Sequence, residues 1–91
     1  MNLETISEFS LAGVSALIVE DENLIAMDVE NLLREFGASL VRTTGSLMEA
    51  RRIMTEHADI SIVLLDLKLR DGCGEELLAE LVAANVPVIV T

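Results

Sequence analysis

Residues 16–22 (ALIVEDE) and 60–66 (ISIVLLD) decide the fold of this chain, because each is an apolar run that ends abruptly in carboxylates. A short, β-branched-rich apolar run bounded by polar residues is typical of a strand buried on both faces, as in parallel sheets. In such sheets, ligands bind beyond the carboxyl ends of the strands. If the two strands are neighbours, Glu20, Asp21 and Asp66 converge on one small site that should hold a cation.

The composition describes one small, acidic domain. The chain has 91 residues, 52% of them hydrophobic, which suits one packed core and is too short for two. Its net charge of −10 argues against nucleic acid or an anionic membrane as a direct partner, and no apolar run approaches the length of a membrane span. Cys73 is the single cysteine, which excludes an internal disulfide and fits a reducing compartment. Residues 1–10 carry Glu4 and Glu8 and no basic segment, so they are not a secretory signal, and we expect a cytoplasmic protein.

The predicted elements alternate between strands and helices. Strands are predicted near residues 16–19, 40–44, 60–65 and 86–90, and helices over 23–36, 46–57 and 75–84. The first helix should bury one face, made of Ile25, Val29, Leu32, Leu33 and Phe36. Ser46 and Glu49 form a capping box at the start of the second helix. This order predicts right-handed crossovers and a parallel α/β sheet with four strands and three helices over residues 16–91, preceded by a leader over residues 1–15.

The three carboxylates indicate metal-assisted phosphoryl chemistry. Adjacent carboxylates raise each other's pKa, and a divalent cation such as Mg²⁺, which prefers carboxylates plus waters, relieves that cost. Asp66 could contact the metal and also attack an electrophile, as carboxylates do when they form aspartyl phosphates. The loop 67–69 could supply a carbonyl to the metal and N–H groups to phosphate oxygens. Acidic residues at strand ends can also be merely solvated, which we accept for Glu22 alone but not for Glu20, Asp21 and Asp66 together.

Four motifs, in this order and on this pattern, resemble the receiver domain of two-component response regulators. They are LIVEDE at residues 17–22, IVLLDL at 62–67, DG at 71–72 and VPVIV at 86–90. The resemblance covers residues 16–91 and implies a flavodoxin-like, doubly wound parallel fold. It also implies phosphotransfer from a histidine kinase or a phosphotransfer protein. The expected protein is a signalling module and not an enzyme, with self-phosphorylation and autodephosphorylation at most.

The same resemblance assigns roles to individual residues. Asp66 corresponds to the phosphoacceptor, and Glu20 and Asp21 correspond to the acidic pair that holds Mg²⁺. The main-chain carbonyl of Lys68 would be a further metal contact. The loop after the acceptor contains Leu67, Asp71 and Gly72, and its Asp-Gly pair should set a turn.

The chain departs from a complete receiver beyond these motifs. The family has five strands and five helices, so this fold should be incomplete. The family's lysine follows the fifth strand, whereas the single lysine here, Lys68, lies in another loop. Thr91 lies four residues after Pro87, and the family's switch hydroxyl usually lies five residues after the proline, so we do not expect Thr91 to be the switch. An uncovered apolar edge and sheet face invite association, so the 91-residue chain should dimerise or swap elements, or belong to a longer protein.

Three functions from different classes stay open. The first is a phosphorylation-dependent receiver that accepts phosphate on Asp66. The second is a non-switching, receiver-like module for protein interaction, which the loss of the family's lysine and of the far face of the sheet favours. The third is a phosphohydrolase of the haloacid-dehalogenase type, which also uses a strand-end Asp. That family needs a second Asp two residues later, where this chain has Lys68, so we rank it last.

Overall fold

The computed structural model describes residues 10–91, so most of the predicted leader lies outside the described residues. The elements are β1 (Ser15–Val19), α2 (Asn23–Glu35), β2 (Leu40–Thr44), α3 (Leu47–Glu56), β3 (Ile62–Leu65), β4 (Lys68–Leu69), β5 (Gly72–Cys73), α4 (Glu75–Ala83) and β6 (Val88–Val90). The predicted parallel sheet of four strands with three helices is confirmed. The short antiparallel hairpin formed by β4 and β5 is an addition that the sequence did not predict. No helix within residues 10–91 is long and apolar enough to cross a membrane.

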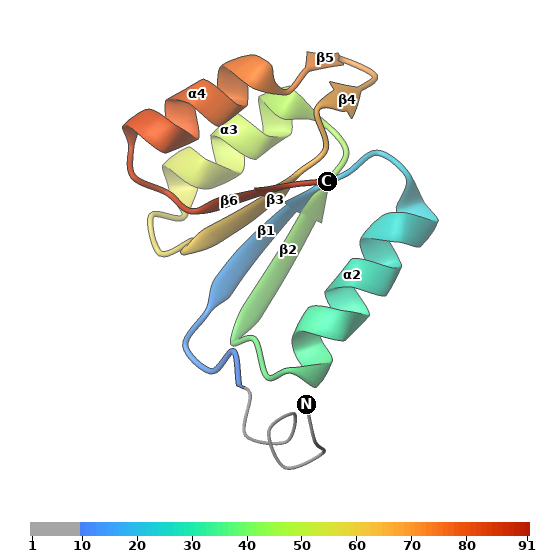
Figure 1. The fold of residues 1–91 in the computed structure, drawn as a ribbon, viewed down its shortest axis with the longest axis vertical. Helices are drawn as coiled ribbons and strands as arrows, with labels where there is room; N and C mark the ends of the chain where they lie inside the picture. The colour runs from blue at the N-terminus through green and yellow to red at the C-terminus, as the bar shows by residue number, and fades with distance from the viewer. Residues whose placement is uncertain (1–9) are drawn as a thin grey trace.

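The sheet has the strand order β2-β1-β3-β6, and every neighbouring pair is parallel (Figure 1). Val19, the last residue of β1, is in register with Thr44 of β2 and with Leu65 of β3. These three strands therefore end level with one another. The residues that follow these strands, which include Glu20 and Asp66, therefore meet at the carboxyl end of the sheet.

The larger core lies between the sheet and the helices α3 and α4, which cover the same face (Figure 1). Its centre consists of four fully buried side chains from β1 and β3, namely Leu17, Val19, Val63 and Leu65. The helices pack Leu47, Ala50, Ile53, Leu77 and Leu81 against them. Fully burying one aliphatic side chain stabilises a fold by roughly 1.5–3 kcal/mol. The two strands that end in carboxylates are therefore also the best anchored strands of the sheet.

Helix α2 covers the opposite face, and only its β1 and β2 side (Figure 1). Ala26 is its one buried residue and packs with Ile18 and Val41. The predicted apolar face is only partly confirmed, because Ile25 and Leu32 are 46% and 51% exposed. Their half of the helix faces the neighbouring part of the same sheet face, over β3 and β6, which α2 does not cover.

An apolar groove marks that uncovered region. It is lined by Leu11, Val14, Leu32, Leu33, Phe36, Ser61, Ile62, Leu64, Pro87 and Ile89. Among residues 10–91, β6 pairs with β3 on one side and with no strand on the other. Ile89 and Val90 are accordingly 50% and 46% exposed. The predicted open edge and bare sheet face are both present in the part of the chain that the structure describes.

Candidate functional site

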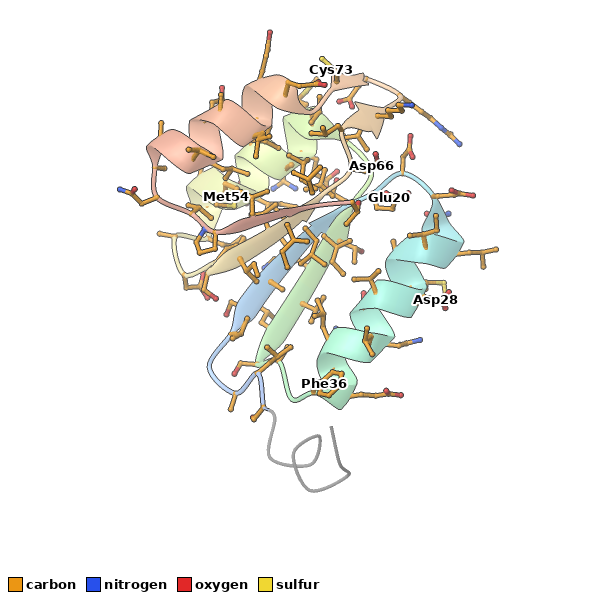
Figure 2. All side chains as sticks on the ribbon, in the orientation of Figure 1. Glu20, Asp28, Phe36, Met54, Asp66 and Cys73 are labelled. Carbon is orange, nitrogen blue, oxygen red and sulfur yellow. The ribbon has the colours of Figure 1, made fainter. Side chains whose placement is uncertain are left out.

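The carboxyl edge of the sheet brings three carboxylates together. One carboxylate oxygen from each of Glu20, Asp21 and Asp66 lies within 4.8 Å of the other two, as the sequence predicted. Figure 2 labels two of these residues, Glu20 and Asp66. Main-chain hydrogen bonds fix two of these residues: the Glu20 N–H donates to the Thr44 carbonyl at 2.8 Å, and the Asp66 N–H donates to the Val19 carbonyl at 2.9 Å. The site therefore inherits its geometry from the register of the sheet.

Burial and mutual repulsion make this cluster costly without a cation. Glu20 is only 8% exposed, whereas Asp21 and Asp66 are partly exposed. Burial raises the pKa of Glu20, and hydrogen bonding to Asp66 and repulsion from Asp66 and Asp21 raise it further, against the opposing effect of the Glu22 N–H. A bound hard cation would favour the charged form of all three groups, and oxygen ligands of this kind suit Mg²⁺.

The loop after Asp66 is a tight hairpin that hydrogen-bonds back to the Asp66 carboxylate. The Lys68 N–H donates to Asp66 Oδ1 at 2.9 Å, and the Gly74 N–H donates to the Leu67 carbonyl at 2.7 Å. Gly74 is buried against this loop: a Cβ there would lie 3.1 Å from both the Asp66 carbonyl oxygen and the Leu67 Cα. The Lys68 residue itself is exposed. The backbone of the loop thus lies against Asp66, and the predicted role of residues 67–69 toward a metal and a phosphate stays a prediction.

Asp71 does more than set a turn. Its carboxylate accepts hydrogen bonds from the Leu47 N–H at 3.1 Å, the Met48 N–H at 3.3 Å and the Ser46 hydroxyl at 3.0 Å. These donors, with the Leu47 N–H contributing most, lower the pKa of Asp71 below its usual range. Sequence reasoning missed this contact because its partners lie 23–25 residues away in the chain.

Arg70 is a second residue that the sequence reasoning missed. Its Nε lies 3.8 Å from Asp21 Oδ2, and its side chain is 89% exposed. Within residues 10–91 it is the one basic side chain in ion-pair distance of the three carboxylates. Lys68, two residues earlier, forms no such pair in the described part of the chain. A guanidinium here can partly offset the charge of the cluster.

Thr91 lies at the same carboxyl end of the sheet as the three carboxylates. Its N–H donates to the Leu65 carbonyl at 2.9 Å, which continues the ladder between β3 and β6. It also lines a small cavity together with Glu20 and Leu64. The structure thus places Thr91 beside the site and leaves the prediction about its hydroxyl as a prediction.

The chain is an α/β protein with a parallel sheet and a cluster of carboxylates at the carboxyl ends of its strands. Proteins of this class can bind a hard cation there. Comparison with known proteins identifies the class further. The profile of the response regulator receiver domain matches residues 16–91, and the chain belongs to this family. Receiver domains are generally signalling modules that bind Mg²⁺ at an acidic pocket, and in this chain Glu20, Asp21 and Asp66 form an acidic cluster.

Individual relatives agree with this assignment. The chain is 42% identical over 77 residues to the transcriptional regulatory protein DpiA of Escherichia coli. The matched region covers 84% of this chain and 34% of DpiA. The chain is also 37% identical over 75 residues to the phyllosphere-induced regulator PhyR of Methylorubrum extorquens. That matched region covers 80% of this chain and 28% of PhyR. The chain thus spans about a third of the length of these relatives.

Solved structures show the same fold. The response regulator PhyR from Brucella abortus superposes with a TM-score of 0.78 at 33% identity, covering 97% of this chain and 37% of that one. The MaeR response regulator bound to beryllium trifluoride superposes with a TM-score of 0.74 at 28% identity, covering 86% of this chain and 64% of that one. The incomplete flavodoxin-like fold predicted from the sequence is therefore confirmed.

Proposed function

We propose that this chain is a phosphorylation-dependent receiver that accepts a phosphoryl group on Asp66, with Mg²⁺, from a histidine kinase or a phosphotransfer protein. The observation that carries the proposal is the convergence of the three carboxylates at the ends of β1 and β3. Membership of the receiver family and the similarity to MaeR, which was solved with beryllium trifluoride, support it. Beryllium trifluoride has the tetrahedral shape of a phosphoryl group when it is bound to a carboxylate.

The residues of the site fit Mg²⁺. We assign Glu20, Asp21, Asp66 and the main-chain carbonyl of Lys68 as its protein contacts, all of them hard oxygen donors. The fit rests on the buried carboxylate of Glu20: burial and the neighbouring Asp66 raise its pKa, so a bound cation would favour its charged form. Glu20 is one methylene longer than Asp and can make its contact through a water. Bound Mg²⁺ would offset the negative charge between the acceptor and the incoming phosphoryl group.

The chain's own residues position the acceptor for an in-line displacement. One carboxylate oxygen of Asp66 attacks the phosphorus of a phosphohistidine, the P–N bond breaks, and the leaving imidazole takes up a proton. The product is an acyl phosphate on Asp66. The hydrogen bond from the Lys68 N–H to Asp66 Oδ1 holds the carboxylate in one orientation, which favours a single line of attack.

The proposal is tested by intact-mass measurement after incubation with Mg²⁺ and a small acyl-phosphate donor. We expect the parent chain to gain one phosphoryl group and Asp66→Asn to gain none. Asp28→Asn is the matched control, because it makes the same chemical change on an exposed face of α2 away from the site (Figure 2). No gain in a parent that demonstrably binds Mg²⁺ would favour the non-switching interaction module. Continuous release of phosphate from varied esters would favour the phosphohydrolase.

A further inference from the structure

One side chain ties the turn of the β4–β5 hairpin to the start of α3. The first N–H groups of a helix have no partner within the helix. The Ser46 side chain satisfies the Glu49 N–H at 3.2 Å, and the Asp71 carboxylate satisfies those of Leu47 and Met48. Because the Asp71 carboxylate also accepts from the Ser46 hydroxyl, the cap of α3 is shared between its own N-cap residue and a distant hairpin.

The start of α3 is also next to the acidic site. The β2–α3 connection packs against the metal-binding loop, since a Cβ on Gly45 would lie 3.1 Å from the Cα of Asp21. The hairpin that carries Asp71 begins at Lys68, whose N–H bonds to the Asp66 carboxylate. The N-terminus of α3 therefore contacts the loop after β1 by packing and the loop after β3 through hydrogen bonds.

We propose that Asp71 is a positioning residue, which holds the hairpin to the N-terminus of α3 and so fixes the acceptor loop in the shape that presents the Lys68 carbonyl to the metal. The inference rests on the proposed function, because the metal and the acceptor belong to it. A residue that only formed the turn would not need three hydrogen bonds to another element. Carboxylates at helix N-termini make charge-assisted bonds, which suit such a tether.

The test measures Mg²⁺ affinity by calorimetric titration of the full chain, at a temperature at which circular dichroism shows each variant to be folded. Asp71→Ala removes the tether. The double variant Asp71→Ala/Ser46→Asp returns a carboxylate to the start of α3 as an N-cap but does not reconnect the hairpin. Ile53→Val removes one buried methylene from α3 and controls for a general loosening of that helix. Phosphorylation of Asp66 is followed in parallel by intact mass.

We expect Asp71→Ala and the double variant to bind Mg²⁺ about ten-fold more weakly than the parent, the lower end of the range for residues that support metal ligands. Ile53→Val should bind it as the parent does. Recovery in the double variant, an equal loss in Ile53→Val, or parental affinity in Asp71→Ala would overturn the proposal. If Asp71→Ala is unfolded, Asp71→Asn, which keeps one acceptor oxygen, replaces it with a smaller expected loss.

Phosphorylation distinguishes failure of this inference from failure of the proposed function. A parent that binds Mg²⁺ but gains no phosphoryl group refutes the acceptor role of Asp66, and the Mg²⁺ affinities still decide the role of Asp71. If the parent and Asp71→Ala bind Mg²⁺ with the same affinity and gain the phosphoryl group at the same rate, the positioning role alone is refuted. A parent that binds no Mg²⁺ refutes both.

Discussion

Replacing the proposed acceptor should make the metal-free protein more stable. Asp66→Asn keeps the size of the side chain and an oxygen for the Lys68 N–H, but it removes one of three carboxylates whose oxygens lie within 4.8 Å of one another. Two unit charges at that separation repel by about 0.9 kcal/mol in water and by about 3.5 kcal/mol at an effective dielectric constant of 20. Because Asp66 is partly exposed, we expect a gain near the lower end, about 1–2 kcal/mol in the free energy of unfolding.

The assay is thermal unfolding followed by circular dichroism, with a chelator present. A gain of about 1–2 kcal/mol corresponds to a rise of roughly 4–16 °C in melting temperature for a domain of this size. The gain should grow as pH rises: the raised folded-state pKa of Glu20 means that its proton is held at low pH, where repulsion is absent, and is lost as pH passes that pKa. Asp28→Asn should change stability by less than about 0.5 kcal/mol.

Mg²⁺ should reverse the ranking of the two proteins. A ligand at 100 times its dissociation constant stabilises the folded state by about 2.7 kcal/mol. The parent should gain this amount, whereas Asp66→Asn, which lacks one metal contact, should gain much less. The reasoning is refuted if Asp66→Asn melts below the parent in chelator at pH 8, or if both proteins gain equally from Mg²⁺.

Four further outcomes are expected. Gly74→Ala should cost about 1–3 kcal/mol in unfolding free energy, since its Cβ would press on backbone atoms of the acceptor loop; an unchanged melting temperature would contradict the close approach. Arg70→Gln should tighten Mg²⁺ binding by up to about five-fold in calorimetry, because an exposed ion pair with Asp21 is worth at most about 1 kcal/mol; weaker binding would mean that Arg70 helps the metal. The stabilising effect of Asp71 relative to Asp71→Asn should be full above about pH 5 and fall as pH drops through the lowered folded-state pKa, and a stability difference that persists in melts well below that pKa would contradict the sign. Sedimentation should show self-association of the chain through the open edge and groove, which Ile89→Lys should abolish; a monomeric parent would exclude that association.

The sequence predicted the sheet from the alternation of apolar runs with helices, and it predicted the convergence of carboxylates because they directly follow two of those runs. It placed strand boundaries less well, and the hydrogen bonds explain why. Ile60 is buried, but its N–H bonds to the His57 carbonyl, so it belongs to the turn before β3. The Val86 N–H likewise bonds back to the Leu81 carbonyl of α4, and Val86 therefore precedes β6. Apolar residues packed beside a strand cannot be distinguished from residues within it by hydrophobicity.

The capping box illustrates a second limit. Ser46 caps the Glu49 N–H as predicted, but the Ser46 N–H bonds to the Thr44 hydroxyl, and the Glu49 side chain pairs with Arg52. The remaining capping groups of α3 come from Asp71. Local patterns identify that a helix begins at this serine, whereas the partner that completes the cap depends on the tertiary fold.

The sheet and the loops contribute different properties to the site. A one-residue slip of β3 against β1 would turn Asp66 to the other face, and the buried residues of both strands oppose that slip. The presence of the carboxylate cluster is therefore tied to global stability. In the proposed site the hairpin contributes the Lys68 carbonyl and orients Asp66. It is held by hydrogen bonds that the exposed Asp71 carboxylate accepts from the start of α3. Substitutions in β1 and β3 should consequently change stability and metal binding together, whereas substitutions in the hairpin should alter the site while the sheet stays intact.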